Sequence, residues 1–60
     1  MNTKVIKEIK REINDNLIDM ELIIELLELP QYQDSEILHR RLKELEENTN
    51  MLKEKLKIIV

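Results

Sequence analysis

The sequence lacks two residue types on which many functional sites depend. It contains no cysteine and no glycine among its 60 residues. Without cysteine the chain has no disulfide, no thiolate metal site and no thiol nucleophile. Without glycine it has no Gly-rich phosphate-binding loop, because such a loop needs residues that let the backbone approach the phosphate closely. We therefore expect a protein that is not an enzyme and that binds no cofactor and no metal ion.

Helix-breaking and aromatic residues are nearly absent as well. Pro30 is the only proline and Tyr32 the only aromatic residue, whereas leucine, isoleucine, glutamate and lysine dominate the chain. Such a composition is typical of long helices. A domain of this size is only marginally stable by itself, and oligomerisation is a common way to stabilise it when disulfides are absent. The sequence predicts an all-α fold that associates with another chain.

The chain also has no long uninterrupted apolar run. Its richest apolar stretch, residues 17–29, is broken by acidic residues and is too short to span a bilayer. Charged residues recur through residues 1–16, which therefore lack the apolar core of a signal peptide. We predict a single cytoplasmic domain over residues 1–60 with no membrane partner. The amino-acid usage, which is rich in lysine, isoleucine, asparagine and glutamate, is typical of a low-GC bacterium or of its phage or plasmid.

One short segment, residues 30–35, divides the chain into two helical parts. Helical backbone is disfavoured for the residue before a proline, so the first helix is predicted over residues 3–29. The side-chain oxygen of Asp34 or Ser35 can cap the next helix, and Glu36 adds a negative charge that favours its start. We predict a loop over residues 30–34 and a second helix over residues 35–59, which together form an antiparallel two-helix hairpin.

Both predicted helices carry a seam with a heptad repeat. Its residues recur at alternating intervals of three and four, which is the spacing of positions a and d in a coiled coil. When the chain folds back at Pro30, the two residue numbers of every facing pair add up to the same value. The predicted pairs are Ile6–Ile59, Ile9–Leu56, Ile13–Leu52, Asn16–Thr49, Met20–Leu45, Ile23–Leu42 and Leu27–Leu38.

One of these pairs is polar. Asn16 and Thr49 fall in the same layer, where their side chains can form a hydrogen bond with each other. A shift by one heptad would place each of them against leucine or isoleucine, at a cost of about 1–3 kcal/mol for each unsatisfied polar group. We interpret the pair as a polar layer that sets the register of the hairpin. The alternative is that the seam merely tolerates the two polar residues.

Apolar residues also lie outside the seam, on one side of the hairpin. Most of them occupy heptad positions c and g, which lie on the same side in both helices of an antiparallel pair. An exposed apolar patch of this kind marks an interaction site. Two hairpins that bury it form an antiparallel four-helix bundle, and the alternative occupant is a helix or groove of another protein. The predicted interface consists of Val5, Ile18, Leu22, Leu26, Leu29, Ile37, Met51 and Ile58.

The charges are divided between the two ends of the predicted hairpin. The open end, residues 1–13 and 52–60, is net positive, whereas the remainder is strongly net negative, and the whole chain has a formal charge of -3. Opposed charges of this kind select the orientation in which two molecules associate. We expect two hairpins to pair head to tail as a two-fold symmetric homodimer.

Two local features contain residues of types that occur in functional sites. Glu36 and His39 have the E-x-x-H spacing that di-iron helical bundles use together with further glutamates. Their heptad positions lie outside the seam, so we expect both side chains to be solvated. Tyr32 is expected to pack over the loop or to stay exposed, and the alternative is that it anchors an interface.

Nucleic-acid binding is the alternative function. Lys4, Lys7, Lys10 and Arg11 form a basic stripe on the first helix, although no aromatic residue is there to stack on bases. In size and layout the hairpin resembles the plasmid Rop family of hairpin dimers, which implies binding to paired RNA loops, but no sequence motif is shared. Our prediction is a non-catalytic protein-interaction module: a homodimeric regulator, inhibitor or adaptor that acts on a host protein.

Overall fold

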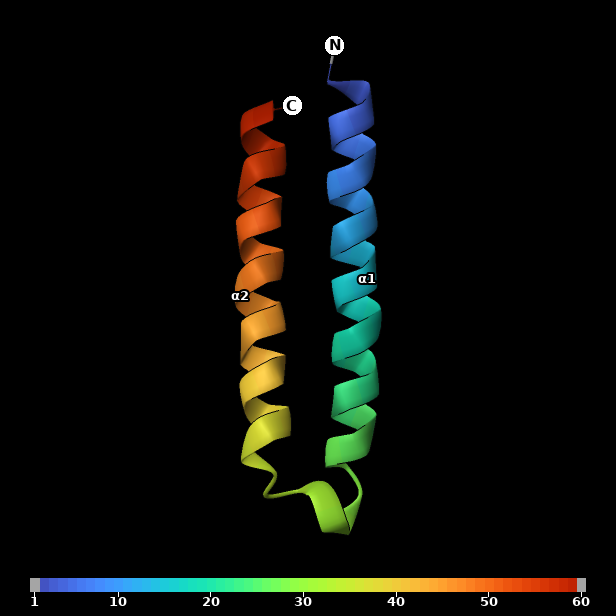
Figure 1. Ribbon diagram of the computed structural model, residues 1–60, viewed down its shortest axis with the longest axis vertical. Coiled ribbons are helices and arrows are strands. Elements are labelled where there is room, and N and C mark those ends of the chain that lie inside the picture. Colours follow the sequence, from blue (N-terminus) through green and yellow to red (C-terminus); the bar gives the residue numbers. More distant parts are fainter. Residues whose placement is uncertain (1, 60) are drawn as a thin grey trace.

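The computed structural model describes residues 2–59, which form two long helices packed side by side (Figure 1). Helix α1 spans Thr3–Leu27, a short 3-10 turn η1 spans Pro30–Tyr32, and helix α2 spans Glu36–Ile59. The chain reverses direction at η1, so the two helices are antiparallel. The predicted all-α helical hairpin is confirmed. The first and last residues of the predicted domain, Met1 and Val60, lie outside the described residues.

The hairpin is long and thin. It measures 48 × 14 × 12 Å between Cα atoms and has a radius of gyration of 14.0 Å. A compact domain of the same length would have a radius of gyration of about 10 Å. The accessible surface is 5043 Å², compared with about 4,200 Å² for a compact protein of this mass. The excess surface arises because no second layer covers either face of the helix pair.

Helix α1 ends at Leu27 and not at the predicted Leu29. Leu29 has extended backbone, with φ −79° and ψ 134°, as a residue before proline prefers. In the last turn the N–H groups of Glu28 and Leu29 donate to the carbonyls of Glu25 and Leu26, at 3.2 and 3.0 Å. These shorter-range bonds tighten the helix end. The predicted boundary was too late because the proline already constrains the turn that precedes it.

The loop contains a 3-10 turn that the sequence pattern did not predict. The Tyr32 N–H donates to the Leu29 carbonyl, and the Ser35 N–H donates to the Tyr32 carbonyl, both at 3.0 Å. Helix α2 begins at Glu36, and the Ser35 Oγ accepts a hydrogen bond from the Leu38 N–H at 3.3 Å. Ser35 is therefore the side chain that caps α2, as one of the two predicted alternatives proposed.

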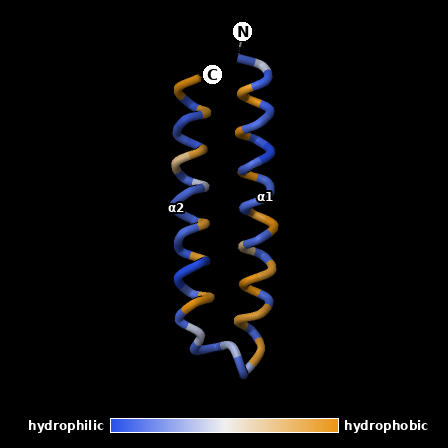
Figure 2. The backbone as a smooth tube through the Cα atoms, viewed as in Figure 1, coloured by the Kyte–Doolittle hydropathy of each residue, from blue (hydrophilic) through white to orange (hydrophobic). Residues whose placement is uncertain are grey.

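The predicted seam forms the contact between the helices, and apolar residues line the facing sides of both (Figure 2). All seam residues are buried or half-buried, and Ser35 is the only other described residue that is not exposed. No described side chain is wholly enclosed. The core is a single thin layer, and its most deeply buried members are Ile9, Ile23, Leu45, Thr49 and Leu52.

Charged side chains cover the outer surfaces of both helices. The ion pairs within residues 2–59 are Arg41–Glu44, at 3.8 Å, and Lys57–Glu54, at 3.4 Å, and both lie within α2. Within this range no ion pair joins α1 to α2, so the helices are held together by the apolar seam. Over the same residues, neither helix combines the length and the apolar character that crossing a membrane would require.

Candidate interaction surface

The predicted apolar interface lies exposed on one side of the hairpin. We call it the lateral apolar face: Val5, Ile18, Leu22, Leu26, Leu29, Ile37, Met51 and Ile58. Every one of these residues is exposed, and Ile58 and Ile37 retain 85% and 76% of their accessible surface. Figure 2 shows apolar segments of α1 near the loop that do not face α2. Large apolar side chains gathered on one side of a small domain are typical of a protein-binding surface.

Each helix contributes to this face through its own spacing. On α1, Ile18, Leu22 and Leu26 recur every four residues and form a ridge on the helix surface. On α2, Met51 and Ile58 are one heptad apart and therefore share position c. Leu22 at c and Leu26 at g lie on the same side as the α2 residues because positions c and g of both helices meet there, and Ile18 at f borders that side.

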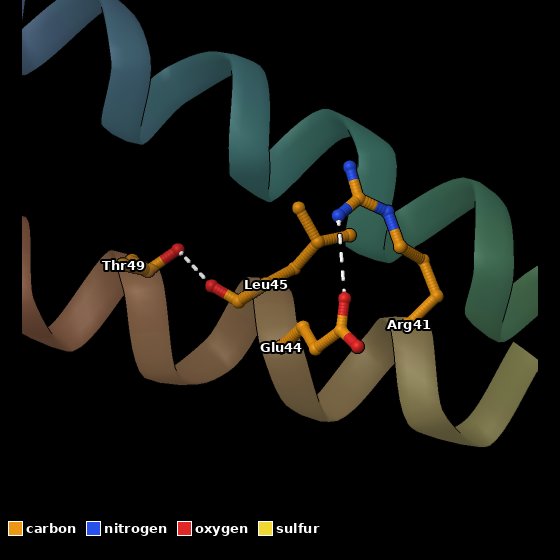
Figure 3. Close-up of polar contacts among 4 residues, drawn as sticks. All are labelled: Arg41, Glu44, Leu45 and Thr49. Atoms are coloured by element: carbon orange, nitrogen blue, oxygen red, sulfur yellow. Dashed lines mark hydrogen bonds and ion pairs between the residues drawn. The ribbon is translucent and has the colours of Figure 1, made fainter.

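An ion pair interrupts the α2 part of the lateral apolar face. Arg41 and Glu44 occupy positions g and c, and their charged groups are 3.8 Å apart on the surface of α2 (Figure 3). Both side chains remain more than half exposed. A pair this exposed contributes little to stability. The pair does neutralise the charges of both side chains, each of which would otherwise be unpaired within an apolar surface.

The side of the hairpin that carries the lateral apolar face is large enough for a stable interface. A face of 48 by 14 Å has a projected area of roughly 700 Å², close to the about 800 Å² that each partner buries in an interface of standard size. By using its whole length, the hairpin can therefore bury about as much surface against a partner as a specific complex requires.

The polar layer has hydrogen bonds that differ from those expected. The Thr49 hydroxyl donates to the Leu45 carbonyl of its own helix at 2.7 Å, while the Leu45 side chain points toward α1 (Figure 3). The Asn16 Nδ2 is buried and has no hydrogen-bond partner. Within residues 2–59 the two side chains thus do not form the bond that their common layer suggested. Thr49 satisfies itself locally, because a threonine hydroxyl readily reaches the carbonyl four residues back in a helix.

The energetic role of the polar layer therefore falls mainly on Asn16. Thr49 is only 3% exposed, but its hydroxyl keeps its partner in any register, since Leu45 lies on the same helix. Asn16 depends on its surroundings, because an amide N–H buried without a partner costs about 1–3 kcal/mol. The assignment of the pair as the register-setting layer stays a prediction, now carried by Asn16.

The basic residues of the predicted stripe, Lys4, Lys7, Lys10 and Arg11, are all exposed. Besides belonging to this stripe, Lys10 lines an open groove between the helices, together with Lys53, Leu56 and Lys57 of α2. This grouping was not predicted from the sequence. The signal was present in the heptad positions, because Lys10 and Lys53 both occupy position e, and the e positions of an antiparallel pair lie on the same side.

Near the loop, His39 forms a hydrogen bond, whereas Glu36 and Tyr32 are exposed. The His39 Nε2 lies 3.0 Å from the Gln33 carbonyl oxygen, so the imidazole links α2 to the loop. Glu36 is exposed in the first turn of α2, and Tyr32 is exposed in η1. Within residues 2–59 no three potential metal-ligating side chains come together. His39 thus has a hydrogen-bonding role in the loop that its sequence spacing did not indicate.

Comparison of the chain with protein-family models, with curated proteins and with solved structures finds no match.

Proposed function

We propose that this chain is a non-catalytic protein-interaction module that forms an antiparallel homodimer through the lateral apolar face. The observation that carries the proposal is the exposure of this face on a hairpin whose core encloses no described side chain. Burial of apolar surface contributes about 25 cal/mol per Å², so a second hairpin adds the layer that the first one lacks. The assembly is a four-helix bundle with α1 packed on α1 and α2 packed on α2.

The distribution of the apolar residues supports an antiparallel arrangement. Leu26, Leu29 and Ile37 lie near the loop, whereas Val5 and Ile58 lie near the open end. Antiparallel pairing brings the first group of one hairpin against the second group of the other. Parallel pairing would bring the two acidic loop ends together, and their like charge opposes it, but only weakly, because many of these charges lie on the opposite face.

The proposed role is that of a regulator, inhibitor or adaptor in the cytoplasm of a bacterium or of a phage-infected cell. With the lateral apolar faces buried against each other, the outer stripes and the loop remain for a second protein. A regulator of this kind acts by occupying a surface on its target.

The homodimer is tested by one substitution in the lateral apolar face. We expect Leu26→Glu to convert the dimer to a monomer, because each interface would then bury two carboxylates without partners. Light scattering at matched concentration in about 1 M salt, where contacts between charges are screened, would show the mass fall by half. Arg40→Ala is the matched control, since it changes the net charge by the same amount at an exposed position on the outer surface of α2. Loss of mass in the control, or none in Leu26→Glu, would contradict the proposal.

Nucleic-acid binding is the second candidate, and the groove beside Lys10 is the observation that favours it. Lys53 and Lys57 add to the basic stripe at the open end, and no carboxylate lines the groove. A phosphate-binding surface would show an affinity for structured RNA that falls steeply with added salt, because bound counterions are released. Salt-independent binding, or none, would exclude this candidate.

A further inference from the structure

The two long faces of the hairpin carry different charge patterns. The side of the hairpin that carries the lateral apolar face, formed by positions c and g, has acidic residues near both of its ends. The opposite face, formed by positions e and b, has a clear division between its ends. Near the open end it carries only basic charges, and near the loop mainly acidic ones. Its charged residues are Lys7, Lys10, Lys53 and Lys57 near the open end, and Glu21, Glu28, Glu36, Lys43 and Glu46 toward the loop.

The basic open end and the acidic loop end of this opposite face could attract each other between two copies, but they do not lie on the lateral apolar face. The charges of the e and b positions lie on the other side of the helix pair, and the Debye length is about 8 Å at physiological ionic strength. They therefore act only weakly across a dimer that forms through the lateral apolar face. The face that carries the opposed charges remains free in that dimer.

At the open end of this second face lies the groove of about 450 Å³ lined by Lys10, Lys53, Leu56 and Lys57, which we call the basic groove. Most of its lining is apolar, because Leu56 forms part of it and the lysines present their methylene chains. Lys57 has an exposed ion pair with Glu54 at 3.4 Å. The basic groove thus suits an apolar side chain that is flanked by negative charges.

Such a side chain is present on the same face near the loop. Ile24 is exposed at position e, and Glu21 and Glu28 are its neighbours three residues before and four residues after. Residues at these intervals are adjacent on a helix surface. Ile24 therefore projects between two carboxylates, and we call these three residues the acidic knob.

The positions of the groove and the knob are related by symmetry. Lys10 and Ile24 lie one heptad before and one heptad after Leu17, and all three occupy position e. A two-fold axis that passes beside Leu17 would place Ile24 of one copy at the height of Lys10 in the other. The same axis pairs the second knob with the second groove, as an isologous interface requires. Leu17, which is exposed, would meet its own counterpart at the centre.

We propose that the basic groove binds the acidic knob of a second copy of this chain. The two contacts form head to tail, with Ile24 against Leu56 and the carboxylates of Glu21 and Glu28 against the lysine ammonium groups. This interface is distinct from the homodimer described above and does not depend on it. A chain that uses both faces has a neighbour on each side, so dimers associate further into larger assemblies at low ionic strength.

The test is a charge exchange carried out in the Leu26→Glu background, where the lateral apolar face is disabled. One variant carries Lys10→Glu and Lys53→Glu, and the other carries Glu21→Lys and Glu28→Lys. Each variant alone has a groove and a knob of the same sign, so each is expected to be monomeric. An equimolar mixture restores opposite signs at both contacts, and its mass by light scattering is expected to double at low salt and to return to monomer at high salt.

The controls keep the result interpretable. All substituted positions are exposed, and circular dichroism checks that each variant stays helical. If the Leu26→Glu background unfolds, the same mixing is done without it, and the readout is mass above that of a dimer. A mixture that assembles no further than its separate components overturns the proposal. Binding of a structured RNA that Lys10→Glu and Lys53→Glu abolish, with no mixing effect, would assign the basic groove to phosphate instead. Failure of the homodimer alone would show as an unchanged mass in Leu26→Glu at about 1 M salt, where the contacts between groove and knob are screened.

Discussion

Replacement of Leu45 by alanine is expected to lower the free energy of unfolding by about 2–5 kcal/mol, the usual cost of a leucine-to-alanine change in a core. Leu45 is 3% exposed and lies in the most deeply buried part of the seam. A chain of this length has a total stability of only about 3–9 kcal/mol. We therefore expect Leu45→Ala to be largely unfolded at concentrations where the hairpin is not stabilised by association. Urea denaturation followed by circular dichroism measures the effect.

Leu17→Ala is the matched control for this prediction, measured in about 1 M salt, where the charged contacts of the second interface around Leu17 are screened. It removes the same atoms from the same residue type on the partner helix, but Leu17 retains 46% of its accessible surface. A surface substitution usually changes stability by less than about 0.5 kcal/mol. Equal losses in the two variants would mean that the seam is not the core of the protein.

Replacement of Asn16 by leucine is expected to raise the free energy of unfolding by about 1–3 kcal/mol, because it removes a buried amide without a partner. The Nδ2 of Asn16 is enclosed and makes no hydrogen bond. For a domain of this size, each kcal/mol corresponds to about 4–8 °C in the melting temperature. Thermal unfolding monitored by circular dichroism gives the value directly.

Thr49→Val is the companion variant, and its expected effect is small. The Thr49 hydroxyl already donates to the Leu45 carbonyl, so its removal exposes no unsatisfied group. The double change of Asn16 to isoleucine and Thr49 to leucine should raise stability and loosen the register or oligomer choice. If Asn16→Leu destabilises the chain instead, the amide has a partner in the assembled protein and the polar layer has a different role.

Much of the fold follows from the sequence because few alternatives compete. The alternation of seam residues predicted which positions are buried, and the structure buries or half-buries all of them. A sequence without glycine and with a single proline leaves one place for a turn, at Pro30. The exposed positions of the lateral apolar face followed from the same heptad count. Its role as an interface remains a proposal.

The details that the sequence did not predict depend on local geometry. The 3-10 turn at Pro30–Tyr32 forms because backbone groups at the helix end find partners three residues back. Thr49 bonds to its own helix because that partner is always within reach, whereas a bond to Asn16 needs a specific approach of two helices. That two residues face each other in one layer predicts that their side chains are close, but it does not predict which hydrogen bonds they form.

The basic groove illustrates the same limit. Counting charges by chain end gave a total for each end but did not show on which side of the hairpin the charges lie. Lys10, Lys53 and Lys57 come together only when both helices are placed in register and their e and b positions are compared. The sequence contains this information, yet it becomes visible only once the two helices are treated as one surface.

We propose that the lateral apolar face joins two copies of this chain. The most direct test is the mass of the unmodified protein by light scattering over a dilution series in about 1 M salt, where the Debye length is about 3 Å and contacts between charges are screened. We predict a mass of twice 7.3 kDa that persists on dilution into the low micromolar range. A helical monomer of 7.3 kDa at every concentration would contradict the claim and would leave the lateral apolar face to a different protein.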